Sequence, residues 1–164
     1  MNMNEEQLIR RDRMRFTKNT LSSGLALLAI LANVFYFVSI YKSDVGSYYY
    51  NILIGASILY NLVFMLVVFL SSEGVKGYKI SYAYVLIVIG ILQILRIFIL
   101  PMRAHAATVT INQQETVVMQ TAQFIRVIVY LCISAACCLV AGVVGIQKSR
   151  ALAQHMATLN QKAA

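Results

Sequence analysis

The chain has 164 residues, of which 60% are hydrophobic and 12% are charged, and its mean hydropathy is +0.72. A typical soluble domain is about 45–50% apolar and about 25% charged, so this composition excludes water as the main solvent of the chain. The net charge of +8 would favour a nucleic-acid partner in a soluble protein. Because the basic residues here flank apolar runs, we expect a lipid bilayer with an anionic inner leaflet as the partner, and no nucleic acid.

Four apolar runs reach the length of about 20 residues that a helix needs to cross a hydrocarbon core of about 30 Å. Short connections join the first run to the second and the second to the third, and such connections are typical of antiparallel neighbours. The pattern predicts an all-α integral membrane protein with four transmembrane helices in an up-down bundle. The runs are 21–40, 48–70, 80–100 and 124–146. The predicted parts are a basic juxtamembrane segment over 1–19, a transmembrane domain over 20–147 and a helical tail over 148–164.

The outer loop near 101–123 has two interpretations. Pro101 ends the third helix, and the β-branched residues on either side of "NQQ" could pair as a hairpin. Asn112 followed by Glu115 instead resembles a capping box, and no Gly or Pro follows from 113 to 141. We favour the second interpretation, in which the last helix begins near Gln113 and reaches about Asn160.

The distribution of basic residues predicts the orientation. Ten of the 14 Lys and Arg residues fall on the side of the two termini and of the connection after the second run. By the positive-inside rule both termini are cytoplasmic, and we expect the protein in the cell membrane. The basic residues before the first run are expected to contact lipid head groups; they are Arg10, Arg11, Arg13, Arg15 and Lys18.

Small residues recur at helical spacing in the first and fourth runs, and such faces allow close helix packing in lipid. We expect these two faces to pack on each other, within one chain or between copies. In the first run they are Ser22, Ala26 and Ala29, and in the fourth they are Ser134, Cys137, Cys138, Ala141, Gly142 and Gly145. The three cysteines, Cys132 included, are interpreted as packing residues, since the C-x-x-C spacing of a metal or redox site is absent.

Three amide side chains, Asn33, Asn61 and Gln93, lie within the predicted spans. An unpaired amide is costly in hydrocarbon, so these residues should face one another or a hydrated cavity. In the first case they are cross-helix bonds that hold the bundle together. In the second case they form a polar site for an ion, a solute or a lipid head group.

Arg96 lies in the third run, five residues before Pro101, and also allows two interpretations. In the one that we favour, its side chain extends to lipid phosphates at the outer surface. In the other, Arg96, Gln93 and Arg126 line an outward-facing pocket for an anion or a lipid head group. The nearby acids are Asp44 and Glu115, both in outer connections, and Arg96 could reach Asp44 only if the first connection folds over it.

The four runs contain no Asp, Glu or His, and no metal spacing or phosphate loop is visible. We therefore expect neither an enzyme nor a cofactor nor a metal site. The first functional hypothesis is an accessory or scaffold subunit that packs through its small-residue faces in a larger membrane complex. The alternative is a homo-oligomeric channel or facilitator for an anion or small polar solute, lined by Asn33, Asn61, Gln93 and Arg96.

Overall fold

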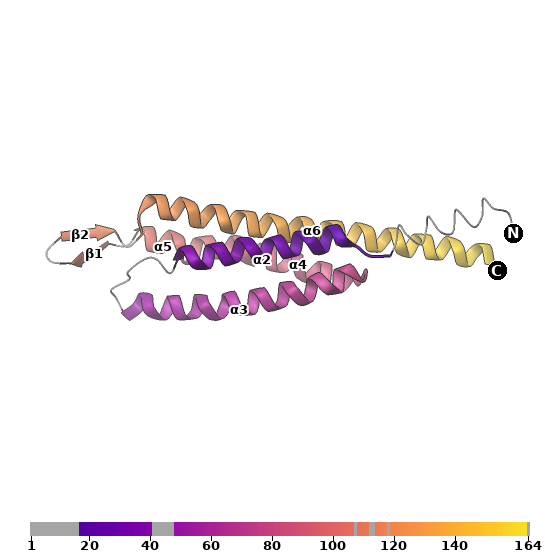
Figure 1. Ribbon diagram of the computed structural model, residues 1–164, viewed down its shortest axis with the longest axis horizontal. Helices are drawn as coiled ribbons and strands as arrows, with labels where there is room; N and C mark the ends of the chain where they lie inside the picture. Colours follow the sequence, from indigo (N-terminus) through magenta and orange to yellow (C-terminus); the bar gives the residue numbers. More distant parts are fainter. Residues whose placement is uncertain (1–16, 41–47, 107, 112–113, 118, 164) are drawn as a thin grey trace.

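The computed structural model describes residues 17–40, 48–106, 108–111, 114–117 and 119–163. The main elements are four long helices, which lie side by side along one axis (Figure 1). A short helix and a two-stranded hairpin follow the third of them. In chain order the elements are α2 (Thr20–Ile40), α3 (Tyr48–Lys76), α4 (Ile80–Ile99), α5 (Pro101–Ala106), β1 (Thr108–Ile111), β2 (Gln114–Val117) and α6 (Thr121–Ala163).

The four long helices confirm the four predicted spans. Each contains a segment that is long and apolar enough to cross a membrane: Thr20–Ile40, Gly55–Lys76, Ile80–Ala106 and Thr121–Thr158. Large apolar side chains cover the outside of the bundle, among them Leu59, which is 65% exposed, and Phe98, which is 57% exposed. An apolar exterior of this kind suits lipid as the surrounding solvent. The fold is that of a multi-pass integral membrane protein.

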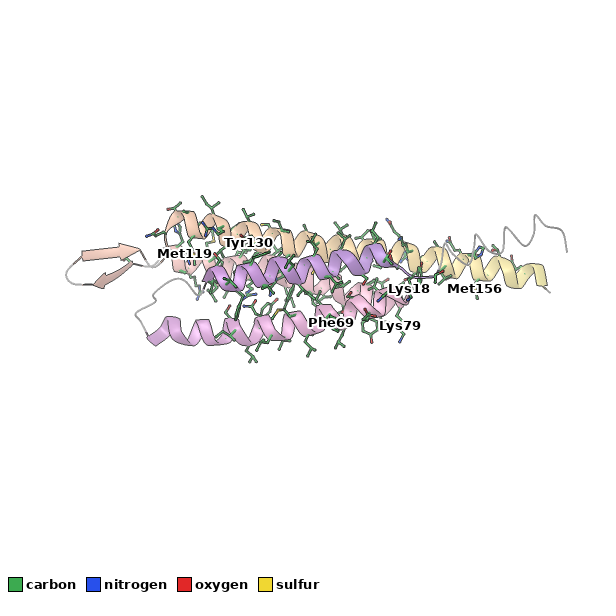
Figure 2. The ribbon with its side chains drawn as sticks, in the orientation of Figure 1. Lys18, Phe69, Lys79, Met119, Tyr130 and Met156 are labelled. Carbon is green, nitrogen blue, oxygen red and sulfur yellow. The ribbon has the colours of Figure 1, made fainter. Side chains whose placement is uncertain are left out.

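Backbone and side-chain hydrogen bonds fix which helix ends meet. The Asn19 backbone N–H, just before α2, donates to the Lys76 carbonyl at the end of α3 over 3.1 Å. The Ser149 hydroxyl of α6 donates to the Tyr78 carbonyl, between α3 and α4, over 3.1 Å. The start of α2, the turn between α3 and α4, and the middle of α6 therefore lie together. Lys18 and Lys79 are found toward this end of the bundle in Figure 2.

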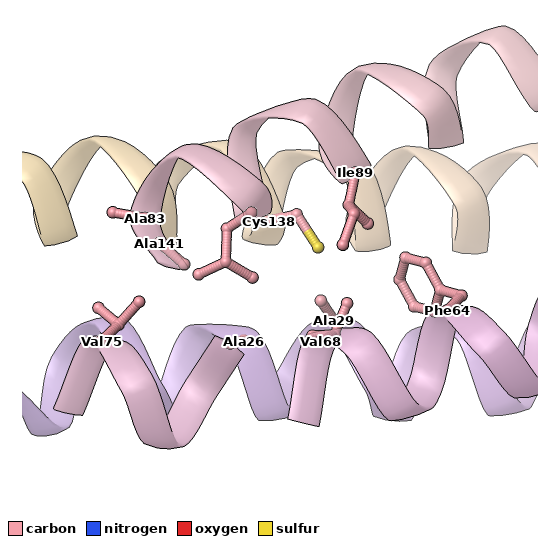
Figure 3. Close-up of a cluster of buried hydrophobic side chains, with 10 residues drawn as sticks. Ala26, Ala29, Phe64, Val68, Val75, Ala83, Ile89, Cys138 and Ala141 are labelled. Atoms are coloured by element: carbon pink, nitrogen blue, oxygen red, sulfur yellow. The ribbon is translucent and has the colours of Figure 1, made fainter. Parts of the chain in front are cut away.

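Small side chains let the helices approach closely at the centre of this half of the bundle. Ala26 and Ala29 of α2 and Ala141 of α6 are fully buried in one apolar cluster. Figure 3 shows these alanines in the same cluster as larger residues of α3 and α4, such as Val68 and Ile89. Close approach matters in lipid because van der Waals packing, and not water exclusion, holds membrane helices together.

A second apolar cluster lies toward the other end of the bundle. It includes Tyr36 of α2, Ala104 of α5 and Leu131 of α6. The His105 ring stacks on Phe124 with ring centroids 4.3 Å apart, so α5 packs against the first turn of α6. Pro101 ends α4 as predicted, but the chain continues directly as α5, because proline is well suited to the first turn of a helix.

The connection between α3 and α4 is shorter than the sequence predicts. The apolar run ends at Leu70, yet α3 continues to Lys76, so only residues 77–79 separate the two helices. The polar residues after Leu70 remain helical because they have partners in the bundle. Ser72, for example, shares a hydrogen bond of 2.8 Å with the Ser23 hydroxyl of α2.

Two residues shape this turn. A Cβ atom on Gly74 would overlap the ring of Tyr82, so a glycine is needed where α3 and α4 approach each other at this turn. Tyr78 then adopts a φ of 59°, in the left-handed region that non-glycine residues rarely occupy. The bond from Ser149 to the Tyr78 carbonyl holds this conformation against α6.

The favoured start of the last helix near Gln113 is wrong. Residues 108–111 and 114–117 pair as an antiparallel hairpin, with Thr108 opposite Val117 and Thr110 opposite Glu115. All four residues of β1 and two of the four in β2 are β-branched and prefer the extended conformation, which outweighs the capping-box pattern. The last helix begins at Thr121 and runs to Ala163. The predicted first turn, within 42–47, lies outside the described residues.

Candidate functional site

Polar side chains from all four long helices meet inside the bundle, next to the second apolar cluster. Their centre is α4, where Gln93 and Arg96 lie one turn apart on the same face. Gln93 is fully buried and Arg96 is 6% exposed. The hydrogen bonds that both residues make in this structure are to protein groups.

Gln93 joins α4 to α2 and α6. Its Nε2 donates to Asn33 Oδ1 over 3.1 Å and to the Ser134 hydroxyl over 3.2 Å. Ser134 in turn donates to the Ala29 carbonyl of α2 over 3.0 Å. This chain of bonds crosses the middle of the bundle, so two of the three predicted amides do face each other.

Arg96 joins α4 to α3. One terminal nitrogen, Nη1, donates to Asn61 Oδ1 over 2.8 Å, and the other, Nη2, donates to the Ser57 hydroxyl over 2.6 Å. The guanidinium carbon also lies 4.4 Å from the ring centroid of Tyr36 and 4.5 Å from that of Tyr60. Two aromatic faces of this kind stabilise a cation that is removed from water.

The prediction that Arg96 extends to the membrane surface is wrong. Its side chain is buried, and its donors are directed to α3. The physical reason is that acceptors and aromatic faces on neighbouring helices lie within direct reach of the guanidinium. The nearest helix end, at Leu100, is about 6 Å farther along the axis.

The charge of Arg96 has no carboxylate partner among the described residues. The salt bridge found there joins Lys76 Nζ to Glu73 Oε1 over 3.0 Å, in the last turn of α3. The possible partner Asp44 lies outside the described residues. A buried cation that has only neutral acceptors is an expensive arrangement, which singles out Arg96 as the most unusual group of the site.

Several further polar atoms of the site have no hydrogen-bond partner, although they are buried. Within the described ranges they include Tyr36 Oη, Asn61 Nδ2, Asn33 Nδ2 and Gln93 Oε1. Buried polar groups are normally bonded, and each exception calls for an explanation. Two of these atoms, Tyr36 Oη and Asn61 Nδ2, can donate a hydrogen bond and belong to residues that contact Arg96.

A cavity of about 260 Å³ lies between α3 and α4 beside Arg96. Its polar walls are Ser57, Tyr60 and Arg96, and the remaining walls are aliphatic side chains of both helices. Several of these, among them Leu92, Leu95 and Ile99, are also exposed on the outside of the bundle. The cavity is therefore a groove that opens sideways toward the surrounding lipid.

The other predicted site residues lie elsewhere. Arg126 is exposed on α6 and does not line the groove. Lys18 is exposed just before α2. The predicted lipid contacts of Arg10, Arg11, Arg13 and Arg15 lie outside the described residues.

The structure brings the two small-residue faces together within one chain. The Ser22 hydroxyl of α2 donates to the Ala141 carbonyl of α6, and Cys138 shares the core with Ala26 and Ala29. Gly142 belongs to a neighbouring face, since a Cβ atom there would meet Ile87 and the Ala83 carbonyl of α4, whereas a Cβ atom on Gly145 would meet Ser22 as well as Val75 and Ala83. Cys137 is only half-buried.

Sequence reasoning missed Tyr36, Ser57 and Tyr60. A spacing signal was available, because three of the four contributing helices each carry two polar side chains one turn apart. The pairs are Asn33 with Tyr36, Ser57 with Asn61, and Gln93 with Arg96. Three such pairs on three spans indicate a shared polar site more strongly than any single amide does.

No protein-family model matches the chain, and comparisons with the curated proteins and with the solved structures give no match either. The described residues hold no cluster of three His, Cys, Asp or Glu side chains that could bind a metal ion.

Proposed function

We propose that the chain is a non-enzymatic accessory subunit of a larger membrane assembly, with its four helices in an up-down bundle and both termini in the cytoplasm of the cell. The observation that carries the proposal is that the polar and small-residue contacts are made within one chain. Gln93 bonds to Asn33, Arg96 bonds to Asn61, and the Ser22 face packs on α6. A bundle that is complete in this way needs no second copy.

The same contacts argue against the alternative, a homo-oligomeric channel or facilitator. Its proposed lining residues, Asn33, Asn61, Gln93 and Arg96, bond to one another in two pairs across the inside of the bundle. A conduction path along them would have to break these bonds. The cavity beside Arg96 opens to the side and lies between two helices.

Because α2 and α6 use their small-residue faces internally, the surface for a partner is expected outside the bundle. The helix α6 has 43 residues. At 1.5 Å per residue it is about 64 Å long, roughly twice the thickness of the hydrocarbon core. Figure 1 shows its C-terminal part extending past the ends of α3 and α4. We propose that this part, residues 150–163, contacts the partner.

The orientation rests on the basic residues. Ten of the 14 Lys and Arg residues lie in the N-terminal segment, the turn between α3 and α4, and the tail. The positive-inside rule then places these three parts on the cytoplasmic side. The accessory role can be tested on purified protein, and the orientation can be tested in cells.

The test compares the full chain with a form that ends after Ser149, each purified in a mild detergent from its native membrane. Native mass spectrometry is expected to show one copy of the full chain with one other membrane protein in fixed ratio, and one copy of the shortened chain alone. If the C-terminus is cytoplasmic, a cysteine placed at Ala163 should react with a membrane-impermeant thiol reagent only after the cells are opened.

A defined homo-oligomer would contradict the proposal. Anion flux into liposomes that falls in Arg96→Leu would then establish the channel instead.

A further inference from the structure

The surroundings of Arg96 contain more hydrogen-bond donors than acceptors. A guanidinium has five N–H groups, and two of them are accounted for by Asn61 Oδ1 and the Ser57 hydroxyl. Arg96 is the charged residue that lines the groove, whereas Asn61 and Tyr36, whose Nδ2 and Oη atoms lack a hydrogen-bond partner, contact Arg96 but do not line the groove. A ligand that suits this site must accept hydrogen bonds and carry negative charge.

The shape of the site limits the rest of the ligand. The groove of about 260 Å³ leads from Arg96 along the aliphatic side chains of Leu92, Leu95 and Ile99 to the lipid-facing surface. An aliphatic chain is the complement of these walls, since it can lie there without exposing apolar surface. The combination of a cationic inner end and apolar walls fits an anionic amphiphile.

The depth of Arg96 favours a carboxylate on a single acyl chain. Arg96 lies four residues before Leu100, the C-terminal cap of α4, and therefore about 6 Å below it along the helix axis. To reach Arg96, a two-chain phospholipid would have to move its phosphate and glycerol groups below the membrane surface. A carboxylate is compact, and its two oxygens match the fork of one guanidinium.

We propose that the groove between α3 and α4 binds a long-chain fatty acid, whose carboxylate pairs with Arg96 and whose acyl chain lies against Leu92, Leu95 and Ile99. Such a pair supplies the carboxylate partner that Arg96 lacks among the described residues. The proposal stands apart from the accessory role, because it concerns a lipid ligand of the bundle and needs no protein partner.

The test measures binding of palmitate and of hexadecanol, which has the same chain without the charge, to the full chain in a neutral detergent. Palmitate is expected to bind with one molecule per chain. Hexadecanol is expected to bind at least about tenfold more weakly, because it cannot form the charge-assisted pair. Equal binding of the two would overturn the proposal.

Three variants locate the site. Arg96→Gln should lower palmitate binding to the level of hexadecanol. Ala56→Phe should abolish it by filling the groove from an exposed wall position, while Arg96 and its partners stay intact. Leu59→Phe is the matched control, because Leu59 is 65% exposed on the same helix and does not line the groove.

Palmitate binding that survives Ala56→Phe in folded protein would overturn the proposal. So would displacement of palmitate by phosphatidic acid but not by oleate, which would indicate a two-chain lipid. Palmitate binding that appears in Asp44→Asn and is missing from the wild type would show that the chain's own carboxylate occupies the site.

Discussion

Arg96 Nη1 donates a hydrogen bond to Asn61 Oδ1 over 2.8 Å, and this bond joins α4 to α3 beside the groove. The amide oxygen carries only partial negative charge, so the formal charge of the guanidinium remains uncompensated by Asn61. The same pair therefore contributes to the stability of the bundle and leaves an anion site beside it. This double role makes Asn61 the most informative position to change.

Asn61→Leu is expected to destabilise the protein by about 1–3 kcal/mol, since it leaves a buried charged donor with one acceptor fewer. Asn61→Asp is expected to be at least as stable as the wild type, because it places a carboxylate against the guanidinium. Unfolding by SDS in mixed micelles measures both.

Leu62→Ala provides the control for Asn61, because Leu62 is 54% exposed on the same helix. It should change the free energy of unfolding by only about 0.5 kcal/mol. If the groove binds a fatty acid, Asn61→Asp should also abolish palmitate binding, since the new carboxylate takes the place of the ligand. Equal stability of Asn61→Leu and the wild type would contradict the bond to Arg96.

Gln93→Met preserves the approximate shape of the side chain but removes both donated hydrogen bonds, to Asn33 and to Ser134. Hydrogen bonds between membrane helices average about 0.6 kcal/mol, so the expected loss of stability is about 1 kcal/mol. The double variant with Asn33→Leu should lose less than the sum of the two single variants, because their shared bond is lost only once. Strict additivity would show that Gln93 and Asn33 do not interact.

The four spans could be predicted from the sequence because each is a run of about 20 apolar residues, and this signal needs no tertiary information. The small-residue rows were visible for a similar reason, since helical spacing puts Ser22, Ala26 and Ala29 on one face without knowledge of the partner. The structure then brings this face against α6.

The environment of Arg96 could not be predicted in the same way. It depends on the rotation of α2 and α3 about their axes, which puts Tyr36 and Ser57 next to the guanidinium. Apolar residues surround both positions in the sequence, and lipid and protein interior are equally apolar, so hydropathy does not reveal which face is inward. The hairpin was not the favoured interpretation, because the sequence pattern of two four-residue strands is weak beside that of a plausible helix start.

Gly142→Ala should destabilise the bundle by about 1–3 kcal/mol through overpacking. A Cβ atom at this position would lie 2.5 Å from Ile87 and 2.8 Å from the Ala83 carbonyl, so a backbone shift of α4 against α6 is required. Gly24→Ala is the matched control, since nothing lies within 4 Å of its Cβ position, and it should leave the stability near that of the wild type. SDS unfolding compares the two, and equal effects would contradict the close contact between α4 and α6.

The reactivity of single cysteines tests the rotation of α6. Cys132 is exposed and Cys138 is fully buried. In proteins that retain one of these residues, with the other cysteines changed to alanine, Cys132 should react faster than Cys138 with the membrane-permeant reagent N-ethylmaleimide, although both reactions are slow because an apolar environment disfavours the reactive thiolate. Cys138 needs a local opening of the helix contacts before the reagent can reach its Sγ atom. In SDS, where those contacts are lost, the two rates should converge. If Cys138 reacted as fast as Cys132 in the folded protein, α6 would have to present a different face to α2 and α4, and the bonds from Ser22 and Gln93 could not form as described.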